Sequence, residues 1–224
     1  MISRYALYDI AELSNRFHVA DGLPKGTKPH YNISPTVSAP VIVSDDGRPI
    51  AKIMQWGIVA QGAKDTNSVF RYKTYVVPSE KIFSRHSWDL AVRERRCLVP
   101  ANGFYELNES GEKRAFYGEP KNKSIVAFAG IYSSWEGPDG TVHDTYAILT
   151  TEPNQDMPDS RMRMPIIINP DDEARWLDPT VTDDGSIYVM LRPAPSGSLN
   201  VYEVSPAVHS PKMNQPNLIK KLQK

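Results

Sequence analysis

The chain has 224 residues, of which 40% are hydrophobic, so it is long enough to bury one substantial core. Its 26 basic and 26 acidic side chains balance, and this excludes a global electrostatic field that would attract nucleic acid or an anionic membrane. Any polyanion must therefore bind to a local patch.

The cysteine count and the hydropathy pattern limit the cellular compartments in which the protein is expected. Cys97 is the only cysteine, which excludes an internal disulfide and a cysteine-rich zinc site and favours a reducing compartment. No basic start precedes an apolar run, and no stretch approaches the roughly 20 apolar residues of a membrane span. We therefore expect a soluble cytoplasmic protein without a membrane partner, folded as one domain over residues 1–224.

The N-terminal part predicts an extended segment followed by a short amphipathic helix. Ile10, Leu13 and Phe17 recur at helical spacing, and Asp9 precedes them as a candidate N-cap. A loop is predicted over residues 21–36.

Beyond this loop the sequence is typical of a β protein. Runs rich in apolar and β-branched residues predict strands over residues 39–44, 49–59, 114–118, 124–135, 145–151, 164–169, 186–191 and 199–205. A further strand-like run follows Cys97 and contains Glu106. Turns rich in Gly, Asp and Pro separate most of these runs.

Few helices are predicted after the first one. Part of residues 84–96 is expected to be helical, and residues 169–177 have the best helix start, with Asn169 as cap and Pro170 at the first helical position. A last helical turn is expected within residues 217–222. The expected fold class is α+β, mainly β, with bent antiparallel sheets.

Standard catalytic and metal-binding motifs are not found in the sequence. It lacks a phosphate-binding glycine loop, an H-E-x-x-H motif and a G-x-S-x-G motif, and its five histidines are scattered. We therefore expect no metal and no cofactor. Cys97 lies before an apolar run and is interpreted as a buried small hydrophobe rather than a nucleophile.

Six short strings occur in a fixed order along the chain. They are SRYAL, YNISPT, MQWGIVAQGAKD, RRCLVPANGFYEL, RMRMPIII and VSPAV. This series resembles the SOS-response-associated peptidase (SRAP) family, whose abasic-site processing proteins cross-link to damaged single-stranded DNA. The resemblance covers almost the whole chain and implies bent antiparallel sheets that form a pseudo-barrel.

The N-terminus departs from the family pattern. Family members begin Met-Cys-Gly-Arg-Tyr, lose the methionine, and capture the aldehyde of an abasic sugar with the amine and thiol of the new N-terminal cysteine. Here Ile2 supplies no thiol. Because methionine is normally removed only before a small residue, Met1 is expected to stay and to displace the free amine by one residue.

Three other elements also differ from the family. In the Asn-Ala-Arg-x-Glu segment, Val76 replaces the Asn and Pro78 replaces the Arg, while Glu80 matches. In the His-Asp-Arg-Met-Pro segment, Arg161 replaces the acid/base histidine and Met162 replaces the Asp, and a family tryptophan beside DNA falls on Gly62. A guanidinium cannot shuttle protons as an imidazole does. The resemblance thus implies a degenerate active site.

Several site positions match the family. The resemblance implies that Arg4 and Arg163 lie near the DNA backbone, that Glu106 is the site carboxylate, and that Asn32 belongs to the pocket frame, together with Pro35, Trp56 and Gly57. Glu106 is then expected near the N-terminal segment and near Arg163 and Arg161. Structural roles are the alternatives: Arg4 pairs with a surface acid, Asn32 forms a turn, and Trp56 belongs to the core.

The first functional hypothesis is noncovalent binding of single-stranded or damaged DNA through Arg4, Asn32, Arg161 and Arg163. Two alternatives stay open. One is a lyase or peptidase that uses the Met1 amine with help from Glu106, and the other is a protein-interaction scaffold without catalysis.

Overall fold

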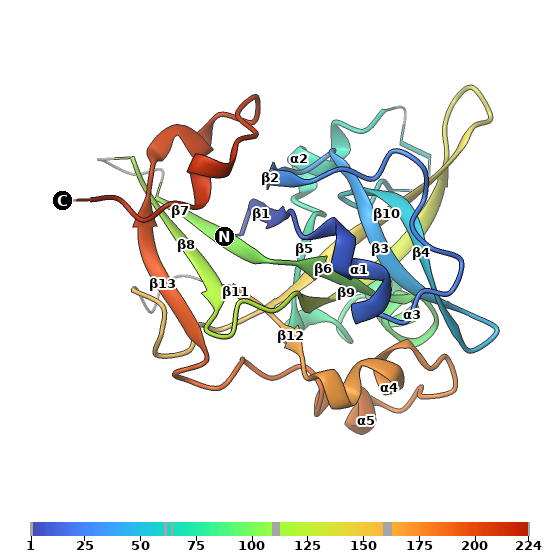
Figure 1. The fold of residues 1–224 in the computed structure, drawn as a ribbon. Helices are drawn as coiled ribbons and strands as arrows, with labels where there is room; N and C mark the ends of the chain where they lie inside the picture. Colours follow the sequence, from blue (N-terminus) through green and yellow to red (C-terminus); the bar gives the residue numbers. More distant parts are fainter. Residues whose placement is uncertain (1, 61, 64, 109–112, 159–162, 224) are drawn as a thin grey trace.

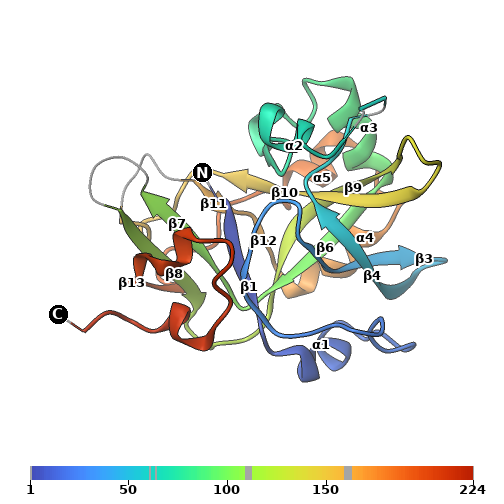
Figure 2. The same ribbon diagram turned by 90° about the horizontal axis from the view of Figure 1, so that it is seen from above.

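The computed structural model describes residues 2–60, 62–63, 65–108, 113–158 and 163–223. Two β-sheets dominate these ranges, and short helices lie around them. Figures 1 and 2 show the sheets next to each other, and the N-terminal strand β1 (Arg4–Leu7), which belongs to one of them, lies where they meet. The α+β, mainly β fold class expected from the sequence is confirmed.

One sheet closes on itself as a five-stranded barrel. Its neighbours in order are β10 (Val142–Thr151), β4 (Arg48–Trp56), β3 (Ser38–Asp45), β6 (Arg96–Ala101) and β9 (Val126–Glu136), and β9 pairs again with β10. The β10–β4 pairing is parallel and short, whereas the other pairings in the ring are antiparallel. Three short strands extend the barrel: β5 (Val76–Pro78) and β11 (Met164–Pro165) on β10, and β12 (Ile167–Ile168) on β9.

The second sheet is antiparallel throughout. Its order is β13 (Leu199–Val204), β8 (Arg114–Pro120), β7 (Gly103–Asn108), β1 and β2 (His30–Ile33). Residues 205–223, called here the C-terminal strap, lead from β13 back to β2. The strap accepts a hydrogen bond from Tyr31 N–H on Asn214 Oδ1 (2.7 Å), and its Leu222 N–H donates to Glu203 O (2.9 Å).

Alternation along β7 divides its side chains between two apolar clusters. Phe104 packs into the main core, which fills the barrel and the space between the sheets. Tyr105 points to the opposite face, where Tyr117, Val204 and Leu218 form a second cluster under the strap. Strand periodicity predicts this division.

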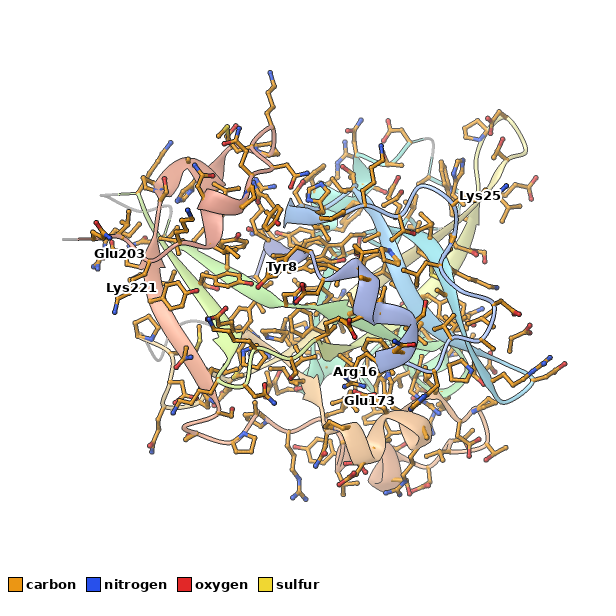
Figure 3. The ribbon with its side chains drawn as sticks, viewed as in Figure 1. Tyr8, Arg16, Lys25, Glu173, Glu203 and Lys221 are labelled. Atoms are coloured by element: carbon orange, nitrogen blue, oxygen red, sulfur yellow. The ribbon has the colours of Figure 1, made fainter. Side chains whose placement is uncertain are left out.

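In the described part of the chain, five short α-helices lie around the sheets: α1 (Ile10–Arg16), α2 (Ser68–Tyr72), α3 (His86–Glu94), α4 (Glu173–Leu177) and α5 (Asp184–Tyr188). Arg16 of α1 forms a two-point ion pair with Glu173 of α4, with N–O distances of 2.8 and 2.5 Å, which ties the two helices together (Figure 3). As predicted, Asn169 caps the turn before α4, because its side chain accepts from Asp171 N–H. None of the helices within the described ranges has the length and hydropathy needed to cross a membrane.

The predicted strand over residues 186–191 is wrong. Asp184–Tyr188 forms α5 instead, and the Asp183 carboxylate accepts from the Ser186 N–H at 2.7 Å as its N-cap. The run Ile187, Tyr188, Val189 favours a strand by propensity, but the cap and the burial of Ile187 in the core decide for a helix.

Smaller departures concern the N-terminal half and the C-terminus. The predicted loop over residues 21–36 contains β2, and Asp9 precedes α1 without capping it, because its carboxylate accepts from Asn102 Nδ2 at 2.9 Å. The last helical turn is a 3-10 turn over Pro216–Ile219, one residue earlier than expected. These features depend on partners far away in the sequence.

Candidate functional site

The N-terminal strand is fixed where the two sheets meet. Tyr5 of β1 is fully buried, its hydroxyl lies 2.6 Å from that of Tyr146 in the barrel, and its ring meets Trp56 edge to face at 5.2 Å. Burial raises the pKa of Tyr5 above its ordinary value. Trp56 is fully buried and donates from Nε1 to Tyr75 O. It therefore belongs to the core, which was the structural alternative to a place in the pocket frame.

Ile2 serves as a packing residue at the position where the resemblance places the family's nucleophile. Its side chain has no exposed surface and belongs to the main apolar core. Met1 lies outside the described residues. The second residue of the chain therefore holds this end of β1 by apolar burial.

Glu106 lies beside the N-terminal segment. In the antiparallel register of β1 and β7, Arg4 pairs with Tyr105 and Tyr5 with Phe104. Continued by one residue, this register places Ser3 across from Glu106, whose side chain is on the same face as that of Phe104 and is only 5% exposed. Strand β7 therefore places the buried carboxylate of Glu106 beside the start of the chain. A role of Glu106 in a functional site stays a prediction.

Arg4 and Asn32 both contact the C-terminal strap. Arg4 Nη2 donates to His209 O at 3.2 Å. Asn32 is fully buried, and its Nδ2 lies 3.1, 3.0 and 2.9 Å from the carbonyl oxygens of Val208, Ser210 and Met213. Asn32 is therefore a framework residue in this structure, and a contact between either side chain and DNA stays a prediction.

Arg163 lies directly before β11, on the barrel side of the junction. Its Nη2 donates to Glu80 Oε2 at 2.9 Å and to Thr150 O at 2.8 Å, and its Nε donates to Thr150 Oγ1. Both ribbon views place β11 close to the start of β1 (Figures 1 and 2). The expected proximity of Arg163 to Glu106 stays a prediction, and Arg161 and Met162 lie outside the described residues.

A cavity of about 170 Å3, called here the basic cavity, is lined by Arg163 and three other cationic side chains. Part of its lining is apolar, since it includes Val76 and Pro78 of β5, which stand where the resemblance places an amide and a guanidinium. The cations come from three separate segments, and the full lining is Tyr72, Lys73, Val76, Val77, Pro78, Lys81, Arg85, Trp88, Thr150 and Arg163. None of these lining residues is acidic.

The cationic side chains of the basic cavity differ in whether an acidic side chain pairs with them. Arg163 is paired with Glu80. For Lys73, Lys81 and Arg85, no ion pair is found among the residues that the structure describes. Like charges held close together without partners attract an anion, and phosphate is an anion of suitable charge. No group of three or more possible metal ligands occurs within the described ranges.

Sequence reasoning missed Lys73, Lys81 and Arg85 as site residues. The run Phe70-Arg71-Tyr72-Lys73 alternates aromatic and basic side chains, which is a pattern found in single-strand binders, and it was the available signal. Lys81 and Arg85 gave no local signal, because the turn Ser79–Lys81 and the start of α3 meet α2 only in the folded chain.

Comparisons with known proteins agree with the motif series. The family model described as SOS response associated peptidase (SRAP) matches residues 1–211. Similar curated proteins include the abasic site processing protein YoqW of Bacillus subtilis, 32% identical with 98% of this chain and 99% of that protein covered. The abasic site processing protein HMCES of Gallus gallus is 28% identical, with 86% of this chain and 66% of that protein covered.

Solved structures share the same fold. A crystal structure of a protein from Bacteroides thetaiotaomicron superposes with a TM-score of 0.77 at 23% identity and covers 97% of this chain and 92% of its own. Another, from Bordetella bronchiseptica, has a TM-score of 0.73 at 20% identity and covers 91% of this chain and 99% of its own. At these identities the likeness establishes the fold alone.

Proposed function

The chain belongs to the SOS response associated peptidase (SRAP) family, and from that premise we propose that it binds single-stranded or damaged DNA noncovalently, without the family's covalent chemistry. The names of its relatives describe abasic site processing, which supports a function related to DNA damage.

The observation that carries the proposal is the basic cavity. A protein with no net charge needs a local patch to bind a polyanion, and this cavity gathers four cations without an acid in its lining. Lys73, Lys81 and Arg85 lack ion-pair partners among the described residues, so a phosphate does not have to displace a carboxylate to reach them. Release of condensed counterions from the nucleic acid then favours binding.

The loss of covalent chemistry is supported by the residues themselves. An isoleucine at position 2 has no thiol, and its burial in the core leaves it no part in a reaction. Val76 and Pro78 cannot polarise a sugar as an amide and a guanidinium can, and Arg161 cannot serve as an acid/base group near neutral pH. A ligand held by the cations of the basic cavity would therefore be bound but would not form a covalent bond with the protein.

The test is fluorescence anisotropy with a labelled single-stranded oligonucleotide at about 50 and 200 mM salt. Lys81→Gln and Arg85→Gln should each weaken binding and lower the slope of log K against log salt by about 0.7 per lost phosphate contact. Lys123→Gln is the matched control, since Lys123 is an exposed lysine in the turn between β8 and β9. Equal effects of all three substitutions would refute the basic cavity as the binding site.

A residual lyase activity through the Met1 amine is the second candidate, and the position of Glu106 beside the N-terminal segment favours it. An amine that attacks the aldehyde of an abasic sugar forms an imine with loss of water, and borohydride reduces this imine to a stable adduct. Borohydride trapping on abasic single-stranded DNA would support this candidate. Absence of both trapping and binding would leave the scaffold role.

A further inference from the structure

Helix α2 presents two large aromatic rings to solvent. Tyr72 is 64% exposed and Phe70 is 53% exposed. Within the described residues neither ring stacks on another aromatic ring or receives a cation over its face. Apolar rings exposed to this extent on a short helix are a cost to the free protein, and such a cost is offset when a partner covers them.

Tyr72 is the shared wall of two cavities. On one side is the basic cavity already described. On the other is a cavity of about 480 Å3, called here the loop cavity, which is lined by Ala60, Gly62, Ala63, Asp65, Asn67, Ser68, Arg71 and Tyr72. The two linings together hold five cationic side chains and one acid, Asp65. An exposed ring thus interrupts a largely cationic surface.

The helix that carries Tyr72 is firmly seated. Val69 is fully buried against Val59 and Trp135, and a Cβ atom at Gly57 would lie 2.2 Å from Val69 Cγ1, so the absence of a side chain at Gly57 allows this close approach. Thr74 and Ile58 exchange hydrogen bonds, because Ile58 N–H donates to Thr74 O at 3.2 Å and Thr74 Oγ1 donates to Ile58 O at 2.5 Å. The ring therefore sits on a preorganised support, which lowers the entropy cost of stacking.

We propose that Tyr72 is a base-stacking residue that selects unpaired nucleotides, with the strand passing from the loop cavity to the basic cavity. This inference rests on the proposed function and assigns one residue of this chain to the recognition of unpaired bases. A duplex hides the faces of its bases and offers phosphates alone, whereas a single strand offers both the face that Tyr72 can cover and the phosphates that Arg71 and Lys73, its neighbours in the chain, can neutralise. Stacking tolerates any base, so the selection is for strandedness rather than sequence.

The experiment compares two oligonucleotides of about 15 nucleotides by fluorescence anisotropy. One is oligothymidylate, and the other has the same length and phosphates but stable tetrahydrofuran spacers in place of its nucleosides, so that it has no base to stack. Wild type should bind oligothymidylate more tightly. Tyr72→Ala should weaken oligothymidylate binding by about 5- to 100-fold and leave binding to the base-free strand unchanged.

Two further variants sharpen the result. Tyr72→Phe keeps the ring and should bind like wild type, and Tyr188→Ala removes a tyrosine of similar exposure (61%) from α5 and should have no effect. Lys81→Gln should weaken the binding of both oligonucleotides, because it removes a phosphate contact and leaves the stacking ring in place. If wild type binds both strands and Tyr72→Ala changes neither, the stacking inference fails while the proposed function stands. If wild type binds neither strand, the proposed function fails and this inference fails with it.

Discussion

Position 2 decides whether this protein can form the family's covalent adduct. We expect no heat-stable adduct with abasic single-stranded DNA on a denaturing gel, because Ile2 has no thiol and its side chain is buried in the core. Ile2→Cys should restore little of it, since the polar groups expected at positions 76, 78 and 161 are absent as well. The comparator is a family member that begins Met-Cys-Gly-Arg-Tyr, and a boiled band of similar yield from the wild-type chain would overturn the expectation.

Lys73 combines backbone strain with a position in the lining of the basic cavity. Its φ of 52° lies in the left-handed region at the end of α2, which costs a non-glycine residue roughly 1–2 kcal/mol. Lys73→Gly should therefore leave the free energy of unfolding unchanged or raise it by up to about 1 kcal/mol, since glycine relieves the strain but gains entropy in the unfolded chain. The same variant should bind oligothymidylate more weakly and with a lower salt slope.

Lys123 provides the control for that prediction. It has φ 54° and is likewise exposed, in a turn away from the cavity. Lys123→Gly should match Lys73→Gly in thermal unfolding and wild type in DNA binding. A Lys73→Gly variant that keeps full affinity and an unchanged salt slope would show that this side chain makes no phosphate contact.

Cys97 is buried, as the sequence indicated, and its reactivity follows from its surroundings. It has no exposed surface, its carbonyl accepts from Trp176 Nε1 at 2.9 Å, and burial raises the pKa of its thiol. Thiol reagents should label it only under denaturing conditions. Prompt stoichiometric labelling of the native protein, followed by mass spectrometry, would contradict this.

At the scale of elements, the candidate site depends on the close packing of α2 against Gly57. Gly57 has φ 117°, and a Cβ there would clash with Val69. Gly57→Ala should lower the free energy of unfolding by roughly 2 kcal/mol or more through strain and overpacking, and should also weaken oligothymidylate binding by displacing α2.

Gly47→Ala separates strain from steric clash. Gly47 also has a positive φ, of 77°, but a Cβ there meets nothing within 4 Å. The Gly47→Ala variant should lose less free energy of unfolding in urea than Gly57→Ala, and it should bind DNA like wild type. Equal losses of stability in the two variants would show that the contact with Val69 does not seat the helix.

Local signals account for the elements that the sequence predicted correctly. Asn169 and Pro170 define the turn before α4 with their own side chains, and the long barrel strands have enough β-branched residues to be recognised. α5 was predicted wrongly because its apolar run outweighed a cap at Asp183. β2 and β5 are three or four residues long, and only their partners in the sheets define them.

At the scale of the whole molecule, the motif series located part of the candidate site and the fold supplied the rest. Arg163 was found because its segment matches the family, and the structure places it on the basic cavity. Lys81 and Arg85 were not found, since their proximity to Lys73 depends on how β5 and α3 pack against the barrel. The contacts of Asn32 with the C-terminal strap could not be predicted either, because they depend on tertiary packing, and its contact with DNA stays a prediction.

The C-terminal strap gives the last prediction. Asn32 is the buried group of β2 that lies against three strap carbonyls, and the strap in turn returns to β13 through Leu222. Asn32→Ala should lower the free energy of unfolding by about 2–4 kcal/mol, because it removes the donor from three carbonyl contacts that are buried or partly buried. Asn217→Ala, at an exposed position of the same strap, should change it by no more than about 0.5 kcal/mol.

Hydrogen exchange distinguishes a local role of Asn32 from a global one. If Asn32 fastens the strap to the second sheet, its loss should speed exchange first at Tyr31, whose amide donates to Asn214 of the strap, and at Leu222, whose amide joins the strap to β13. The five-stranded barrel, which shares no hydrogen bond with Asn32, should keep its protection, and the basic cavity on the barrel side should keep its affinity for oligothymidylate. Loss of DNA binding in Asn32→Ala, with the barrel still protected, would instead place a DNA contact at Asn32 itself, one of the residues for which the sequence predicts it.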